Sequence, residues 1–251
     1  MLRKQIFYDF WYKLYKLSLK GMNIGEVAGG VETSGECNVF KLVKDISNEP
    51  KVLFDIGANR GEYTKALLNN FPDAQIHSFE PAEATYKTLQ DNITANNVKL
   101  NNFGISDVIS ESVLYYDKEN SGLASLYNRQ LDYFGIGFSK SETVKLDTLD
   151  HYCRENDISR IDLLKIDIEG NELNALKGAA ELLAEKRIKA IQIEFGGCNI
   201  DSRVFFRDFW NLLHENFRMY RILKNGFKEI LQYDERLEIF VTTNYLFVLK
   251  E

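Results

Sequence analysis

Two short segments carry the residues best suited to binding chemistry. Residues 52–64 read as a buried strand, a glycine turn and a helix start, and residues 76–81 read as a second strand that ends in Glu80. Gly57 and Gly61 permit positive φ and let bare backbone approach a ligand, beside the unpaired N–H groups of the helix start. Glu80 lies 19 residues beyond Gly61, about where a strand-end carboxylate meets a ribose diol in a nucleotide-binding βαβ unit. The spacing predicts a site for an adenosine-containing ligand.

The acid before the glycine turn distinguishes between such ligands. A dinucleotide-binding turn reads G-x-G-x-x-G and directs a helix start at a pyrophosphate. Here the turn reads Asp55-x-Gly57-x-x-x-Gly61. A carboxylate at this place would repel a pyrophosphate, but it suits a ligand with an ammonium group, such as the amino-acid end of S-adenosylmethionine. The motif therefore favours S-adenosylmethionine over NAD, and an ordinary βαβ turn without a ligand is the alternative.

A third segment, Asp162–Ile168, is a predicted central strand with polar residues inside it. Because side chains alternate along a strand, Lys165, Asp167 and Glu169 are expected on one face. A lysine in such a strand is costly unless it is paired or functional. Lys165 is therefore either a catalytic residue or half of a structural salt bridge with Asp167. Glu172 stands where the helix dipole favours an acid, which indicates a helix-start residue.

From residue 50 onward, predicted strands and helices alternate, which indicates an α/β fold with a mostly parallel central sheet flanked by helices. The core strands are expected at Val52–Ile56, Gln75–Phe79, Lys99–Phe103, Asp162–Ile168 and Ala190–Glu194. The helices are expected at Glu62–Asn70, Glu83–Asn96, Leu149–Asn156, Glu172–Glu185 and Arg203–Asn216. A small β insertion before the fourth strand is expected from Ser112–Tyr116, Leu123–Tyr127 and Thr143–Leu146. The closing strands are expected at Arg218–Leu223, Glu229–Leu231 and Glu238–Leu249.

Acids stand at the predicted carboxyl ends of the strands, where ligands of open α/β sheets bind. They are Asp55, Glu80, Asp107, Asp167 and Glu194. This arrangement predicts an acidic site along one edge of the sheet.

These segments resemble the FkbM-type methyltransferases. The likeness is carried by Asp55–Thr64, Phe79–Pro81, Leu146–Leu149 and above all by Leu164–Leu173, whose run Lys-Ile-Asp-Ile-Glu-Gly is its most specific part. It extends over roughly residues 35–250. The resemblance implies a Rossmann-like class I methyltransferase fold that uses S-adenosylmethionine. It also implies methyl transfer to a hydroxyl group of a sugar, a glycan or a related natural product.

The resemblance implies roles for individual residues as well. Asp55, Gly57 and Asn59 would frame the methionine end of the cofactor, with Gly61 in the same turn. Glu80, followed by Pro81, would hold the ribose, and Ile105, Ser106 and Asp107 would flank the adenine. Glu36 would close over the amino-acid end, and Asp167 would face the methyl group.

An alkyl hydroxyl is a poor nucleophile, so a proton acceptor is expected beside the transferred methyl group. Of the three histidines, His77 lies inside a predicted buried strand and the other two belong to no motif. Asp167 and Glu194 are therefore the candidate bases, with Glu169 behind them. Clustered carboxylates are also ligands for hard cations. Magnesium or manganese at these acids is conceivable, but no metal site is expected.

The amino-acid composition limits the classes of partner that this protein is expected to bind. The 251 residues are 45% hydrophobic and 27% charged, which fits a soluble globular protein of one main domain. The net charge of −6 argues against a nucleic-acid partner. Three widely spaced cysteines form neither a zinc motif nor a disulfide framework, and they fit a reducing cytoplasm. No apolar run reaches the ~18–20 residues of a membrane span.

The N-terminal segment differs from the rest. Residues 1–20 carry five basic residues and one acid, a net of +4, so the other 231 residues carry −10. An aromatic and aliphatic stripe at helical spacing is formed by Ile6, Phe7, Phe10, Trp11, Leu14 and Leu17. This amphipathic helix would lie on an anionic membrane, cover the active site, or dock on the domain or on a second subunit, and the last arrangement allows a homodimer.

The glycine-rich residues 21–35 are predicted to form a loop, either a lid or a plain connector. The chain thus divides into an appendage, residues 1–35, and a methyltransferase domain, residues 36–251. The acceptor is expected to be read by this loop and by the insertion 108–145, whose tyrosines would stack on sugar rings or fill a small core.

Two other classes of function compete with methyl transfer. A protein that binds S-adenosylmethionine without turnover, as a scaffold of the same fold, is the first. An NAD-dependent oxidoreductase is the second, and the missing G-x-G-x-x-G weakens it. A methyltransferase that modifies nucleic-acid bases is disfavoured, because such enzymes use prolines after the fourth strand to bind a flipped base and no proline follows Asp167 here.

Overall fold

The centre of the protein is an eight-stranded sheet with the strand order β10-β9-β11-β8-β7-β1-β2-β3. The computed structural model describes residues 4–25, 30–47 and 49–250, so parts of the N-terminal segment and of the glycine-rich loop lie outside the described residues. The five parallel strands are β1 (Val52–Ile56), β2 (Gln75–Phe79), β3 (Val98–Asn101), β7 (Leu163–Ile166) and β8 (Ala190–Phe195). The antiparallel edge consists of β11 (Thr243–Leu249), β9 (Phe217–Leu223) and β10 (Gly226–Ile230). The predicted mostly parallel sheet is confirmed.

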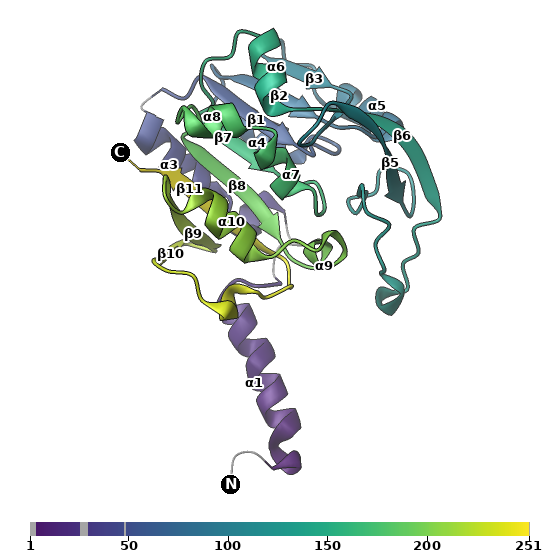
Figure 1. Ribbon diagram of the computed structural model, residues 1–251, viewed down its shortest axis with the longest axis vertical. Coiled ribbons are helices and arrows are strands. Elements are labelled where there is room, and N and C mark those ends of the chain that lie inside the picture. Colours follow the sequence, from purple (N-terminus) through teal and green to yellow (C-terminus); the bar gives the residue numbers. More distant parts are fainter. Residues whose placement is uncertain (1–3, 26–29, 48, 251) are drawn as a thin grey trace.

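Helices cover both faces of this sheet, so the protein has the expected Rossmann-like α/β architecture (Figure 1). One face packs on α3 (Cys37–Ser47), α4 (Glu62–Asn70) and α5 (Glu83–Asn92). The other packs on α6 (Leu149–Glu155), α7 (Glu172–Lys177), α8 (Ala180–Ala184) and α10 (Phe206–Leu213). The neighbours Leu53 and Phe54 of β1 belong to opposite cores and are both fully buried. A strand buried on both faces needs such a continuous apolar run.

Three predicted helices differ from those observed, and the predicted loop 21–35 contains a short helix, α2 (Val31–Ser34). The helix expected at Glu83–Asn96 ends at Asn92, because Ile93 is extended. Residues 172–185 form α7 and α8 rather than one helix. The break falls at Gly178, where a Cβ atom would lie 2.1 Å from the backbone oxygen of Ser106. The predicted helix Arg203–Asn216 begins later, at Phe206, because Arg203 adopts a left-handed conformation after the short α9 (Cys198–Ser202).

The predicted β insertion is a three-stranded sheet, β4-β6-β5, formed by Gly104–Ile105, Lys140–Asp147 and Ser110–Tyr116. The predicted strand Leu123–Tyr127 is wrong: its pairing in the sheet is a single bridge between Ser125 and Tyr115. The insertion lies beside the carboxyl ends of β1 and β2, and its side chains reach the cavity described below.

The N-terminal segment forms a short 3-10 turn, Gln5–Phe7, followed by α1 (Tyr8–Gly21). Figure 1 shows α1 projecting from the domain as a single helix. Leu19 is the one buried residue of α1. Docking of this helix on its own domain is therefore wrong, because its apolar side chains are in solvent. No helix among the described residues is long and apolar enough to cross a membrane.

Candidate active site

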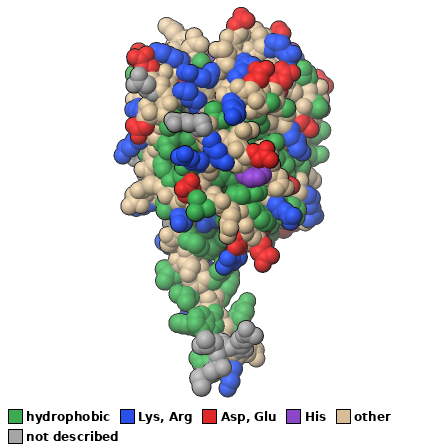
Figure 2. Space-filling view, turned by 60° about the vertical axis from the view of Figure 1, so that its left-hand side comes forward, with side chains coloured by type: hydrophobic (Ala, Val, Ile, Leu, Met, Phe, Trp, Pro, Cys, Tyr) green, Lys and Arg blue, Asp and Glu red, His purple; other side chains and the backbone are tan. Residues whose placement is uncertain are grey.

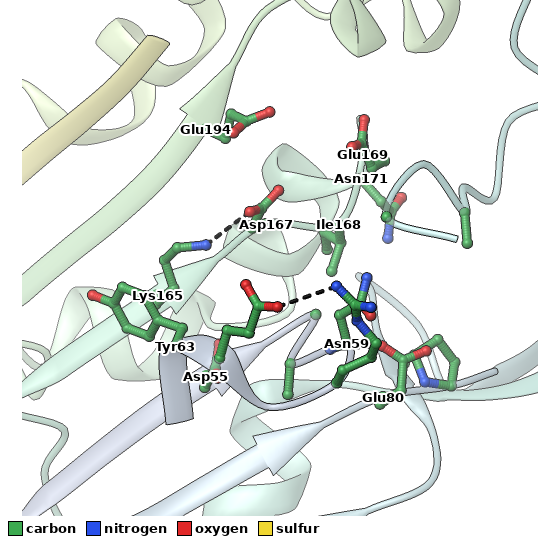
Figure 3. A pocket seen from close by; sticks show the side chains of 18 of the residues that line it. Asp55, Asn59, Tyr63, Glu80, Lys165, Asp167, Ile168, Glu169, Asn171 and Glu194 are labelled. Atoms are coloured by element: carbon green, nitrogen blue, oxygen red, sulfur yellow. Dashed lines mark hydrogen bonds and ion pairs between the residues drawn. The ribbon is translucent and has the colours of Figure 1, made fainter. Parts of the chain in front are cut away.

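A cavity of about 380 Å³ lies at the carboxyl ends of β1, β2, β7 and β8. The chain leaves β1 toward β2 and β3 on one side and returns to β7 on the other, so the site is at the topological switch point of the sheet. Figure 3 shows acids from each of these four strands, or from the residues that follow them, lining the cavity. The cavity thus lies at the edge of the sheet where the sequence predicted an acidic site.

The turn after β1 depends on glycine. The N–H groups of Gly57 and Ala58 both donate to the carbonyl oxygen of Phe79, at 3.0 and 2.9 Å. Gly57 has φ +82°, and a Cβ atom there would lie 1.9 Å from the carbonyl oxygen of Asp167. No side chain fits this contact. The turn therefore brings the end of β1 against the end of β7 and leaves backbone at the cavity wall.

Glu80 is held in a fixed orientation at the end of β2. Its Oε2 accepts a hydrogen bond from the N–H of Asn59 at 3.0 Å, and its Oε1 accepts one from the N–H of Ala82 at 2.9 Å. Burial raises the pKa of Glu80 to about 7, against the opposing effect of these two donors. A carboxylate positioned in this way retains lone pairs for two further donors, such as the hydroxyls of a diol.

Three buried oxygens in the cavity wall have no hydrogen-bond partner among the described residues. They are Oδ1 of Asp55, of Asn59 and of Asn244. The other oxygen of Asp55 accepts from the hydroxyl of Thr64 at 2.6 Å, and burial raises the pKa of Asp55 to about 6. Buried acceptors are rarely left unpaired, so these atoms fit a ligand that donates hydrogen bonds.

Glu36 reaches the cavity from the segment before α3 and is fixed by a buried network. Its two oxygens accept hydrogen bonds from Ser34 Oγ at 2.7 Å and from Gln192 Nε2 at 2.5 Å. The hydroxyl of Tyr63 donates to Gln192 Oε1 at 2.8 Å. The carboxylate thus lines the same cavity as Asp55 of β1, where it adds negative charge.

Lys165 and Asp167 form an ion pair at the centre of the site, with 2.9 Å between Nζ and Oδ2. Burial works against the charge of Lys165, but Asp167, Glu36 and Asp55 outweigh it and raise its pKa. The Nζ atom also lies 5.1 Å from the ring centroid of Tyr63. Lys165 is therefore a fixed positive charge among acids, and it holds the carboxylate of Asp167 in place.

Three acids converge beyond this pair. Oxygens of Asp167, Glu169 and Glu194 lie within 4.8 Å of one another, and Figure 3 shows the three side chains on the same side of the cavity, with Asp167 nearest to Lys165. Burial, and then repulsion between the acids, raises the pKa of Glu194 well above its ordinary value and also raises that of Glu169. Glu169 is further held in an ion pair by Arg129. The cluster could hold a divalent cation or receive a proton.

The turn after β7 shapes this cluster. Strand β7 ends at Ile166, earlier than predicted, and Glu169 has φ 52°, which is unusual for a residue with a side chain. The carboxylate of Glu172 is fully buried and accepts from the N–H groups of Ile168 and Gly170 at 3.0 and 3.1 Å. Glu172 thus closes the turn, in agreement with its interpretation as a helix-start residue.

The structure brings together most of the residues expected from the sequence. The cavity is lined by Glu36, Asp55, Gly57, Asn59, Glu80, Pro81, Ile105, Lys165, Asp167 and Glu194. Gly61, Ser106 and Asp107 do not line it. A Cβ atom at Gly61 would meet Leu89 and Ile93 of the neighbouring helical layer, and Ser106 Oγ accepts a hydrogen bond from Asn171 at 3.3 Å. Gly61 and Ser106 thus lie behind the wall, whereas Asp107 is exposed and accepts a hydrogen bond from Ser106 Oγ at 3.1 Å.

Many further residues that line the cavity were not among the predicted site residues, for example Tyr63, Gly122, Asn171 and Asn244. Asn244 is paired with Glu194 between β11 and β8. Its one sequence signal is an amide near the start of an otherwise apolar strand. His77 is buried and bonded to the hydroxyl of Tyr152 at 2.8 Å, which confirms it as a core residue.

Comparison with known proteins gives one family and several relatives. The profile of the family described as Methyltransferase FkbM domain matches residues 55–234. Methyltransferase sdnD of Sordaria araneosa is 31% identical over 55% of this chain and 64% of its own length. 2-O-methyltransferase NoeI of Sinorhizobium fredii is 25% identical over 64% of this chain and 72% of its own. Hexuronic acid methyltransferase AglP of Haloferax volcanii is 25% identical over 64% of each chain. The matches with sdnD and AglP thus cover less than two thirds of those proteins.

Proposed function

The chain belongs to the FkbM methyltransferase family, and from this premise we propose that it transfers a methyl group from S-adenosylmethionine to a hydroxyl oxygen of a sugar or related natural product. One observation carries the proposal. The acids suited to a cationic adenosine ligand and the acids suited to receive a proton line the same cavity. The methyl donor and the hydroxyl acceptor would therefore meet at Asp167, between the acids that bind the donor and the acids that receive the proton.

The residues of the cavity fit the methyl donor. Glu80 would accept hydrogen bonds from the ribose hydroxyls, and the unpaired oxygens of Asp55 and Asn59 would face hydrogen-bond donors of the ligand. Glu36 would hold the ammonium group through charge, together with Asp55. Negative charge at this end disfavours a pyrophosphate, which supports S-adenosylmethionine over NAD as the ligand.

The chemistry requires a proton acceptor beside the transferred group. S-adenosylmethionine, when bound, supplies a methyl group on a sulfonium, and its transfer breaks the S–C bond, forms an O–C bond and releases the hydroxyl proton. Asp167 is held by Lys165, whereas the pKa of Glu194 is raised. Glu194 is therefore the better proton acceptor, and Asp167 supplies fixed negative charge facing the sulfonium.

The nature of the acceptor is supported by the relatives. NoeI is named a 2-O-methyltransferase and AglP a hexuronic acid methyltransferase. Both names fit a hydroxyl-bearing or sugar-like acceptor for this chain. Incubation with S-adenosylmethionine that carries a labelled methyl group, across a panel of sugars and glycans, tests this directly. Label in an ether-linked methyl group supports the proposal, whereas label on nitrogen or carbon only would contradict it.

Transfer should fall as the pH is lowered through the pKa of Glu194, because only its ionised carboxylate accepts a proton. Burial and the neighbouring acids raise this pKa well above 4.5, so the acid limb of the kcat profile should lie above that of an ordinary glutamate. We expect Glu194→Gln to lower kcat by about 10²-fold or more and to remove this limb. The exposed Glu215→Gln is the matched control. If the acid limb of the kcat profile were unchanged in Glu194→Gln, another residue would have to be the proton acceptor.

Metal removal gives a separate prediction. Lys165 and Arg129 already place positive charge beside Asp167 and Glu169, two of the three clustered acids. A second source of positive charge is then not needed to keep the acids together, so transfer should continue at an unchanged rate in excess EDTA. Loss of activity in EDTA that magnesium or manganese restores would contradict this and would place an ion on the cluster.

A further inference from the structure

Helix α1 presents a large apolar surface to solvent. Ile6 in the preceding turn is 82% exposed, and Phe10 and Leu17 are 58% and 64% exposed. Figure 2 shows hydrophobic side chains along the part of the molecule that extends from the domain. Contiguous exposed apolar surface of this kind marks an interaction site in a folded protein. The structure therefore contains an interaction surface that the proposed methyl transfer does not use.

The distribution of side chains around the helix indicates what covers it. At 3.6 residues per turn, Lys13, Lys16 and Lys20 fall within an arc of about 60° together with Asp9. Apolar and aromatic side chains occupy about two thirds of the circumference. A single partner helix covers only a narrow seam of two positions in seven. A helix that lies in the plane of an interface buries such a wide apolar arc and keeps its lysines at the boundary with water.

The charge of the segment selects among such surfaces. Residues 1–20 carry a net charge of +4, whereas the remaining residues carry −10. An anionic surface would repel the acidic domain and attract this segment. The segment is also rich in tyrosine and tryptophan, for example Tyr8, Tyr12 and Tyr15, and these side chains are enriched where a bilayer meets water. The chemistry therefore fits anionic lipid.

The base of α1 is bonded to the rim of the cavity. The N–H of Gly25 donates to the carbonyl oxygen of Thr242 at 2.8 Å, and the side chain of Asn23 donates to the carbonyl oxygen of Ser34 at 2.8 Å. Thr242 stands two residues before Asn244, and Ser34 two residues before Glu36. Both Asn244 and Glu36 line the cavity. The segment after α1 is thus hydrogen-bonded to residues that stand two positions before residues of the cavity wall.

We propose that α1 binds the surface of an anionic lipid bilayer, with its aromatic and aliphatic arc in the interface and its lysines among the headgroups. The helix lies in the plane of the surface and does not span it. It keeps the rim of the cavity close to the bilayer. This inference is independent of the proposed methyl transfer, because its test measures lipid binding alone.

Vesicle flotation with the full chain tests the proposal. Vesicles of phosphatidylcholine with an equal part of phosphatidylglycerol should bind the protein at least about tenfold more tightly than phosphatidylcholine alone. Salt at about 1 M, where the screening length is about 3 Å, should reduce the difference. Absence of flotation with both vesicles would overturn the proposal.

Three variants sharpen the test. Phe10→Ser/Leu17→Ser should lose binding to both vesicles, and Lys13→Glu/Lys16→Glu should lose the preference for phosphatidylglycerol. The matched control, Lys177→Glu/Lys228→Glu, reverses two exposed lysines on the domain and should keep that preference. Equal loss in the control would overturn the role of α1. Thermal unfolding should be the same for all, because the substituted side chains are exposed.

Analytical ultracentrifugation without lipid separates lipid binding from self-association. The proposal expects a monomer both for the unsubstituted chain and for Phe10→Ser/Leu17→Ser. A dimer that this variant converts to a monomer would show that a second copy covers α1, and would overturn the proposal.

Discussion

Replacing Asp167 with asparagine should reduce methyl transfer by about 10²- to 10³-fold while binding of S-adenosylhomocysteine stays within about tenfold. Asparagine keeps the shape of the side chain but removes the negative charge that Lys165 holds in place at 2.9 Å. That charge faces the sulfonium in the proposed arrangement, so its loss affects the transition state more than the bound ligand. Transfer rates with saturating donor and calorimetric binding constants separate the two effects.

The exposed Asp73→Asn is a matched control, because it removes a carboxylate at the opposite end of β2. It should change neither transfer nor binding. Thermal unfolding of Asp167→Asn shows whether the unpaired Lys165 destabilises the fold. Near-normal turnover in a folded Asp167→Asn protein would mean that Asp167 has no part in the chemistry.

Glu80→Ala should weaken binding of S-adenosylhomocysteine by about 10²-fold or more. A hydrogen bond to a charged group contributes about 1.5–3 kcal/mol, and the proposed arrangement has two of them to the ribose. About 1.4 kcal/mol corresponds to a tenfold change in affinity. Isothermal titration calorimetry with S-adenosylhomocysteine measures the loss.

Because Asn59 and Ala82 donate to Glu80, the alanine variant also loses two local contacts. Glu80→Gln, which keeps one acceptor oxygen, provides a second variant that is closer in shape. The matched control is Glu83→Ala, which removes only an exposed ion pair with Lys87 at 3.0 Å. Unchanged affinity in both Glu80 variants would assign the ribose contact to another residue.

The sheet could be predicted because its signal is local. The strands around Leu53 and Leu164 are short, mainly apolar runs with one charged residue each, and glycine or an acid follows each of them. The break between α7 and α8 could not be predicted in this way. The run from Leu176 to Ala180 holds one glycine among good helix formers, and the break arises where Gly178 packs against Ser106, far away in the sequence.

The residues of the site also differ in how well the local sequence predicts them. The places of Asp55, Glu80 and Asp167 in the cavity were predictable, because each stands at or directly after the end of a strand that the local sequence indicates. The orientation of Glu36 depends on Gln192, which is 156 residues away, and Asn244 reaches the cavity only through the pairing of β11 with β8. Such contacts between distant segments leave no pattern in the local sequence.

The exposed position of α1 was one of several arrangements that its pattern allowed. The stripe of aromatic residues predicts a helix with one apolar side, and it does so equally for a docked helix and for a projecting one. What decides between them is the surface offered by the rest of the domain. The described structure buries only Leu19 of α1.

Calorimetric titration of the purified protein with S-adenosylhomocysteine and, separately, with NAD tests the central claim most directly. The account predicts one bound S-adenosylhomocysteine per chain in the micromolar range and much weaker binding of NAD, because the acids around Asp55 and Glu80 accept a cationic ligand and repel a pyrophosphate. Tighter binding of NAD, or no binding of S-adenosylhomocysteine by a folded protein, would contradict the proposed use of this cavity.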